Sequence, residues 1–331
     1  MRMDGLLKKR LLCLAMAMLL AGGCGARQKP EGAAPRAGTQ TAVVTSLPEP
    51  KDEKVETPLK YALAASFETK LDSATGIAIG ADDRVYVAWA EGVKVFDADM
   101  KPLWGVKTAG AARAVAVDAS GNIYAAERVL VETFDSSGKP LASWGREGKG
   151  RGEFSVLSAI AVSGANVFAA DPGNRCVHRF DLTCDFIDEL GKRDKDSKDP
   201  GLICPSAILD CKVGAQGNVR IVNPGRQRIE RYRLTGELMD FWGEPGVAPE
   251  NFIGCCNPAH IAFGPDGRIV TGEKGIPRVK VYSGDGKLLA YIGPSLFSDT
   301  TSAPDVAVDS KGRIYALDTG DGRVKIFAEE K

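Results

Sequence analysis

The feature that most constrains the fold of this chain is a short unit, a tight turn followed by a strand, that occurs six times in its 331 residues. The copies recur at roughly 40 to 50 residues, which is the length of one four-stranded propeller blade. An apolar run precedes each copy, and a strand that ends in an aromatic residue follows it. The sequence therefore predicts an all-β protein, a six-bladed β-propeller. The six copies are Asp82–Tyr86, Ser120–Tyr124, Gly164–Phe168, Gln216–Arg220, Asp266–Val270 and Lys311–Tyr315.

The two ends of the repeat region predict how the ring closes. The sixth unit has no room for a fourth strand after Phe327, whereas Tyr61 to Thr69 has the alternation of a strand but no blade of its own. We therefore expect the N-terminal strand to complete the last blade. Closure of this kind removes the exposed sheet edges that an open array of strands would leave.

The N-terminal residues predict export. Basic residues, among them Arg2 and Lys8, precede the apolar run Leu11–Leu20, which is too short to span a bilayer, and three small residues follow. Residues 1–23 are therefore predicted to be a signal peptide. Residues 24–59 lack an apolar period and are predicted to be a flexible tether, since they cannot bury enough surface to offset chain entropy. The propeller domain is expected to span residues 60–331.

This N-terminus resembles a bacterial lipoprotein signal, although Ala21 stands where such signals usually carry leucine. The resemblance implies that Cys24 is lipidated and that the protein is anchored in the cell envelope, on the outer membrane or the periplasmic side. Gly25 after the cysteine implies the outer membrane. An ordinary secretory signal with an incidental cysteine is the alternative, and in both cases the mature chain is exported.

Three further stretches resemble a known repeat. Gly121–Tyr124 (GNIY), Gly148–Phe154 (GKGRGEF) and Asp171–Arg175 (DPGNR) are similar to the NHL-repeat family of six-bladed propellers, and the likeness runs from about residue 60 to the end. The block with GCCNP at 254–258 and EKGIPRVKVY at 273–282 resembles a subset of exported bacterial NHL proteins, for which no activity is implied. We expect its Glu273-Lys274 pair to be exposed in a polar loop.

The charge balance limits the partners of the protein. The chain has 43 basic and 43 acidic residues and no formal net charge. A nucleic-acid-binding protein usually needs a basic face, so we expect no nucleic-acid partner. We expect a monomer that meets the membrane through its lipid anchor and an envelope protein or glycan through its propeller.

Polar residues mark the ends of five of the six second strands. In a propeller these ends lie on one face, around the mouth of the central channel, so they are candidates for binding a ligand. The basic side chains of Arg226 and Lys274 could add positive charge for an anionic ligand. The alternative is that the polar residues cap turns by accepting backbone N–H bonds. The predicted ligand-binding residues are Glu127, Asp171, Asn223, Arg226, Glu273, Lys274 and Asp318.

Three titratable residues occupy one aligned position at the start of the first strand. Blades one to three have small residues there, but blades four to six carry Asp210, His260 and Asp305. Two carboxylates and an imidazole can hold a divalent cation, calcium or zinc, with water completing the coordination. A hydrogen-bonded network without metal is the alternative. The three-histidine zinc set of some NHL-type lyases cannot be built here, because the chain has only two histidines.

Six cysteines lie in the propeller region. An exported protein meets oxidising conditions, so we expect disulfides among Cys176, Cys204, Cys255 and Cys256. The adjacent pair can form a vicinal disulfide, or each member can reach another partner such as Cys204. No C-x-x-C spacing is present, which argues against a thioredoxin-like or haem-attachment motif.

These observations leave three functions open. The first, which we favour, is a membrane-tethered module that binds or scaffolds an envelope protein or glycan and needs no cofactor. The second is a metal-dependent hydrolase or lyase at the channel mouth, and the third is a redox role for the adjacent cysteines. The sequence has no nucleophile elbow, P-loop or dinucleotide-binding fingerprint.

Overall fold

Six four-stranded antiparallel sheets make up the part of the chain that the structure describes, which is residues 55–193, 198–298 and 302–330 of a computed structural model. The predicted signal peptide, Cys24 and most of the predicted tether lie outside these residues. Blade one contains β2 (Gly76–Ile79), β3 (Val85–Trp89), β4 (Gly92–Phe96) and β5 (Pro102–Lys107). Blade two contains β6 (Ala114–Val117), β7 (Ile123–Ala126), β8 (Val131–Phe134) and β9 (Pro140–Trp144). Blade three contains β10 (Ala159–Ser163), β11 (Asn166–Asp171), β12 (Cys176–Asp181) and β13 (Phe186–Leu190).

The second half of the chain repeats this arrangement. Blade four contains β14 (Cys211–Val213), β15 (Val219–Asn223), β16 (Arg228–Tyr232) and β17 (Leu238–Trp242); blade five contains β18 (His260–Phe263), β19 (Ile269–Glu273), β20 (Arg278–Tyr282) and β21 (Leu288–Ile292); and blade six contains β22 (Asp305–Val308), β23 (Ile314–Asp318) and β24 (Arg323–Glu329), joined by β1 (Tyr61–Glu68). Two single-turn 3-10 helices, Pro224–Arg226 and Pro294–Leu296, lie in the loops.

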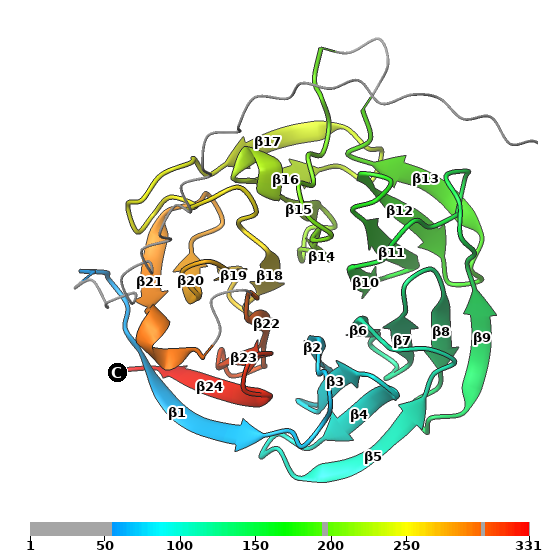
Figure 1. The fold of residues 1–331 in the computed structure, drawn as a ribbon, viewed down its shortest axis with the longest axis horizontal. Coiled ribbons are helices and arrows are strands. Elements are labelled where there is room, and N and C mark those ends of the chain that lie inside the picture. Colours follow the sequence, from blue (N-terminus) through cyan, green and yellow to red (C-terminus); the bar gives the residue numbers. More distant parts are fainter. Residues whose placement is uncertain (1–54, 194–197, 299–301, 331) are drawn as a thin grey trace, which may run out of the picture. The chain divides into compact units, whose positions relative to one another are not determined.

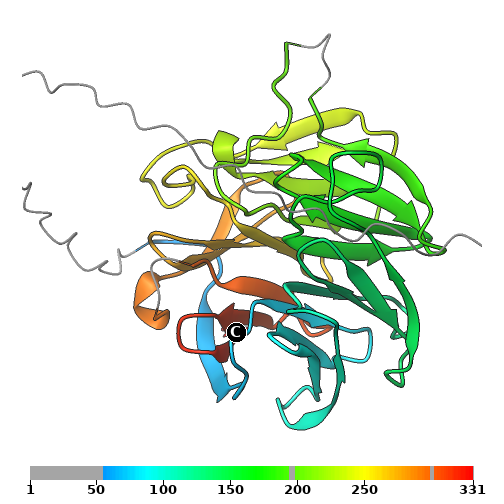
Figure 2. The same ribbon diagram turned by 45° about the vertical axis from the view of Figure 1, so that its right-hand side comes forward.

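The six blades form a ring around a central axis (Figure 1). The first strand of each blade lies innermost, and each of these strands contacts the first strand of both neighbouring blades, which completes the circle. A turned view shows the sheets packed against one another around the axis (Figure 2). The prediction of an all-β, six-bladed propeller is therefore confirmed.

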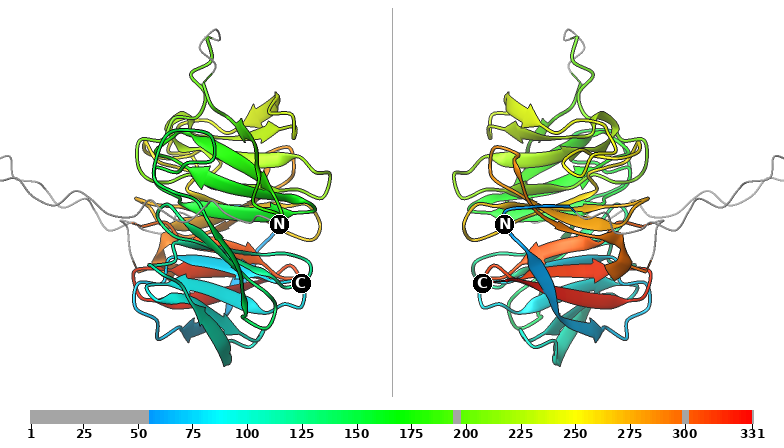
Figure 3. Two further views of the ribbon diagram at one scale, coloured as in Figure 1. Left: turned by 90° about the vertical axis from the view of Figure 1, so that its right-hand side faces the viewer. Right: turned by 90° about the vertical axis from the view of Figure 1, so that its left-hand side faces the viewer.

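The N-terminal strand closes the last blade. β1 pairs antiparallel with β24, from Tyr61 opposite Glu329 to Glu68 opposite Arg323, with one irregularity after Leu63. Figure 3 shows β1, in blue, beside the red β24. The predicted strand at residues 61–69 and its place in the ring are confirmed.

The sequence pattern explains why the strands form where they do. The turn after each first strand needs a residue with positive φ, supplied by Gly267 (φ 81°) in blade five and by Asp83 (φ 60°) in blade one. The aromatic residue near the end of each third strand is at most 4% exposed. Burying one such side chain stabilises the fold by about 1.5–3 kcal/mol, so these six positions anchor the packing between blades. Those residues are Phe96, Phe134, Phe180, Tyr232, Tyr282 and Phe327.

None of the described residues belongs to a helix with the length and apolar character needed to cross a bilayer.

Candidate site at the channel mouth

A hollow of about 430 Å³ lies where the loops that precede the inner strands converge. Its wall is mostly small or apolar, with Ala111, Ala207 and Leu209 as examples, and its titratable side chains are Arg113 and His260. The loops before β2, β6, β10 and β14 and the start of β18 contribute to it, so five blades build one surface. The central channel, of about 210 Å³, is lined by apolar inner-strand residues and by one charged residue, Lys212.

Three of the predicted site residues meet beside this hollow. His260 Nδ1 lies 3.3 Å from Asp305 Oδ1 and 3.8 Å from Asp210 Oδ2. One ligand atom from each residue falls within 4.8 Å of the others, a spacing that a divalent cation could bridge. The aligned position in blades four to six thus brings Asp210, His260 and Asp305 together, as the sequence predicts.

A fourth charged residue, which the sequence analysis missed, completes this cluster. Lys212 Nζ lies 2.9 Å from Asp210 Oδ1. The spacing of two residues could have revealed it, because residues i and i+2 of a strand face the same side. We call Asp210, Lys212, His260 and Asp305 the axial cluster.

The carboxylates of the axial cluster also bind the backbone of the next blade. Asp210 Oδ2 accepts the N–H of Ile261 at 2.9 Å, and Asp305 Oδ2 accepts the N–H of Ile77 at 2.8 Å. The second oxygen of each accepts the N–H of the residue that follows it, Cys211 or Val306. Every carboxylate oxygen of the pair therefore already has a hydrogen-bond donor.

The electrostatics of the axial cluster favour internal pairing. Burial opposes ionisation of Asp210, but the Lys212 charge and the His260 hydrogen bond outweigh it and lower the pKa of Asp210. Burial likewise opposes protonation of His260, yet Asp305 and Asp210 raise its pKa above the usual 6.5. Burial raises the pKa of Asp305. A metal ion would have to bind a neutral imidazole and compete with the Lys212 ammonium, so these residues do not fit a metal without rearrangement.

The polar residues at the second-strand ends are buried rather than displayed. Asp171, Asn223, Glu273 and Asp318 are at most 3% exposed, and Glu127 is 8% exposed. The prediction that Glu273 is exposed is wrong, since its side chain is buried. Ion pairs with Arg278 at 2.9 Å and Lys280 at 2.6 Å offset the cost of burying its carboxylate. Lys274 is half-buried. Their role as ligand-binding residues stays a prediction, and the alternative that such residues hold local structure accounts for their contacts.

The same pairing recurs from blade to blade. The residue at the end of the second strand contacts a titratable residue on the third strand of its own blade. The pairs are Asp171–His178 at 3.6 Å, Asn223–Glu230 at 2.8 Å, Glu273–Lys280 at 2.6 Å and Asp318–Lys325 at 2.5 Å. In blade two, Glu127 faces another acid, Glu132, and burial together with that contact raises the pKa of Glu127. Arg226, from the predicted set, instead pairs with Asp199 at 2.7 Å.

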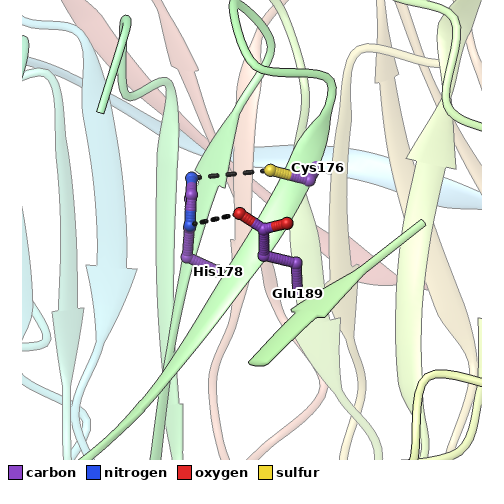
Figure 4. A group of neighbouring side chains, drawn as sticks. All are labelled: Cys176, His178 and Glu189. Atoms are coloured by element: carbon purple, nitrogen blue, oxygen red, sulfur yellow. Dashed lines mark hydrogen bonds and ion pairs between the residues drawn. The ribbon is translucent and has the colours of Figure 1, made fainter. Parts of the chain in front are cut away.

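Blade three holds a second group of potential metal ligands (Figure 4). Cys176 Sγ lies 3.4 Å from His178 Nε2, and Glu189 Oε1 lies 3.6 Å from His178 Nδ1. A thiol, an imidazole and a carboxylate in this order resemble a nucleophile, its base and the group that orients the base. Cys176 and His178 are 0% exposed, and burial raises the pKa of the Cys176 thiol. No substrate reaches these atoms, so the group is part of the interior, with His178 edge-on to Phe154 at 5.3 Å.

The structure does not show the predicted disulfides. All six cysteines of the described residues are free thiols. The sulfur atoms of Cys255 and Cys256 are 3.3 Å apart, well beyond the ~2.05 Å of a disulfide bond.

Comparison with known proteins supports the fold. No family model matches the chain, and no curated protein matches its sequence. Among solved structures it is similar to a streptogramin B lyase (TM-score 0.57, 13% identity, covering 82% of this chain and 98% of that one) and to a virginiamycin B lyase from Staphylococcus aureus (0.56, 12%, 81% and 99%). It is also similar to a protein of unknown function from Bacteroides thetaiotaomicron (0.55, 15%, 83% and 75%). At these identities the likeness establishes a β-propeller fold, the architecture that the NHL resemblance implies.

Proposed function

We propose that this protein is an exported, membrane-tethered propeller that binds a protein partner at its channel mouth. The observation that carries the proposal is the hollow of about 430 Å³, a concave surface built by loops of several blades with apolar walls, the Arg113 guanidinium and the His260 imidazole. Arg113 and His260 supply hydrogen-bond donors for an acidic or carbonyl group of the partner. The internally paired axial cluster stiffens the rim of this surface without providing a free catalytic group.

A protein partner fits the wall of the hollow better than a glycan. The described residues that line it include no aromatic side chain on which a sugar ring could stack, and they include several small apolar ones. Such a wall accepts an apolar side chain from a loop of the partner. A lipid on Cys24 and the tether that follows would hold this surface close to the membrane, which rests on the sequence prediction for the N-terminus.

Site-specific photo-crosslinking tests the proposal. A benzoylphenylalanine at Ala111 or Ala207, both exposed in the wall of the hollow, should form the same discrete adduct in the envelope of the producing cell, and Arg113→Ala should weaken it. Ser120 is the matched control, since it is exposed in the turn at the opposite end of β6. Adducts that form equally at Ser120, or that fail to form at both wall positions, would refute the mouth as the binding surface.

The second candidate is a metal-dependent hydrolase or lyase. It is supported by the 4.8 Å grouping of Asp210, His260 and Asp305, which could hold calcium or zinc after Lys212 moves away. Two of the similar structures are described as lyases, which concerns those proteins. Metal content separates this candidate from the binding module.

A further inference from the structure

The adjacent thiols of Cys255 and Cys256 lie in the long loop between β17 and β18. Cys255 is exposed, whereas Cys256 is 8% exposed. Their sulfur atoms are 3.3 Å apart, so they need to approach by only about 1.2 Å to bond. One thiol is thus open to a molecule in solution, and the other lies directly behind it.

The surrounding contacts fix this loop in place. Asn257, 2% exposed, donates from Nδ2 to the carbonyl oxygens of Ile253 and Lys274, both at 2.8 Å, and accepts the Lys274 N–H at 2.9 Å. Gln227 Nε2 donates to the carbonyl of Gly254 at 2.6 Å. Both sides of the cysteine pair are therefore tied to neighbouring elements, and Lys274 is held beside it.

The other described cysteines differ from this pair in their surroundings. Burial raises the pKa of Cys204 to about 11 and that of Cys211 to about 12. A thiol with a raised pKa gives little thiolate, which is the reactive form. Within the pair the two pKa values move in opposite directions. A hydrogen bond with Ser206, the contact with Cys255 and the Lys274 charge outweigh burial and lower the pKa of Cys256, whereas the contact with Cys256 raises the pKa of Cys255. Cys255 is therefore the thiol that an incoming disulfide meets first because it is exposed, and not because its pKa is low.

We infer that Cys255 and Cys256 form a redox-active dithiol that exchanges with disulfides of small thiols or of a thiol–disulfide oxidoreductase. The Cys255 thiolate attacks one sulfur of the incoming disulfide, which releases one thiol and leaves a mixed disulfide on Cys255. The Cys256 thiolate then attacks Cys255 Sγ and releases the second thiol. Two electrons and two protons pass from the cysteines to the incoming disulfide, which becomes two thiols, and the protein gains one S–S bond.

The roles of the two cysteines can be tested separately with oxidised glutathione as the probe. The full chain is incubated over a range of glutathione redox ratios, alkylated and analysed by mass spectrometry of the peptide that contains residues 255 and 256. We expect the wild-type peptide to lose two hydrogens under oxidising conditions and to be doubly alkylated under reducing ones. Cys256→Ser should stop at a glutathione adduct on Cys255. Cys255→Ser should give at least ten-fold less adduct, because Cys256 is buried.

Two results would overturn this inference. One is alkylation of both wild-type cysteines at every redox ratio, and the other is oxidation that joins Cys255 or Cys256 to Cys204 instead. Unchanged thermal unfolding of both serine variants excludes misfolding as the cause of their altered adducts. Cys184, half-buried in the turn after β12, is the internal control. In the described part of the chain no second thiol contacts it, so it should retain any adduct it forms.

Discussion

The Asp210 carboxylate of blade four accepts the backbone N–H of Ile261 in blade five at 2.9 Å. Asp305 of blade six repeats this bond with Ile77 of blade one at 2.8 Å. Two of the six blade boundaries are thus joined at the axis by a side chain that also belongs to the axial cluster. The residues that look most like a catalytic or metal site therefore also hold the ring together.

Removing the Asp210 carboxylate should destabilise the propeller strongly. Asp210→Ala leaves the Lys212 ammonium and the Ile261 N–H without their partner, and breaking a partly buried ion pair from one side costs about 3–5 kcal/mol. Urea unfolding followed by circular dichroism measures the loss. Asp99→Ala, at the exposed turn after β4, is the matched control and should change the unfolding free energy by less than about 0.5 kcal/mol. Equal effects of the two substitutions would show that Asp210 carries no structural bond.

The buried ammonium of Lys280 should make stability depend on pH. Burial lowers the pKa of Lys280 from 10.5 to about 8, although Glu273 opposes the shift. Between about pH 8 and about pH 10.5 the unfolded chain binds more protons at this residue than the native protein, so its contribution to the unfolding free energy rises with pH. Lys280→Met should remove that rise, measured as the difference in urea midpoint between variant and wild type across this window. Lys287→Met, at an exposed turn, should leave the slope as it is, and a slope retained in Lys280→Met would contradict this account.

Deletion of residues 60–69 should abolish cooperative folding. It removes β1, the outer strand of blade six, and exposes the edge of β24 along its full length. An unpaired edge of this kind also invites association between chains. Thermal unfolding followed by circular dichroism, with light scattering, provides the measurement. A truncated protein that unfolds at the wild-type temperature would show that β1 is dispensable for closure.

Most of the fold follows from the sequence because each blade repeats the same turn and strand pattern, and alignment of the six copies also places Asp210, His260 and Asp305 together. The alignment does not show which of the aligned polar side chains are buried. In the sequence Glu273 has the pattern of an exposed loop residue, but in the structure Arg278 and Lys280 of the third strand form ion pairs with its buried carboxylate.

The group in blade three was missed for a related reason. His178 and Glu189 lie directly opposite each other on β12 and β13, a register that depends on the irregularity after Arg179. The position of a bulge is not visible in the pattern of apolar residues, because it changes which residues face each other without changing which residues are apolar. The partner of His178 could therefore be found only from the structure.

The central claim is that the axial cluster is an internally paired charge network beside a binding surface. The metal content of the purified full chain tests this claim most directly. After equilibration with zinc or calcium and removal of excess ion, the account predicts that wild type and His260→Ala contain the same amount of metal, because Lys212 and the backbone donors occupy the Asp210 and Asp305 oxygens. Cys176→Ser and the double variant Cys255→Ser/Cys256→Ser report any ion held by the thiols. One ion per wild-type chain, lost in His260→Ala and kept in the cysteine variants, would contradict the account and favour the metal-dependent enzyme.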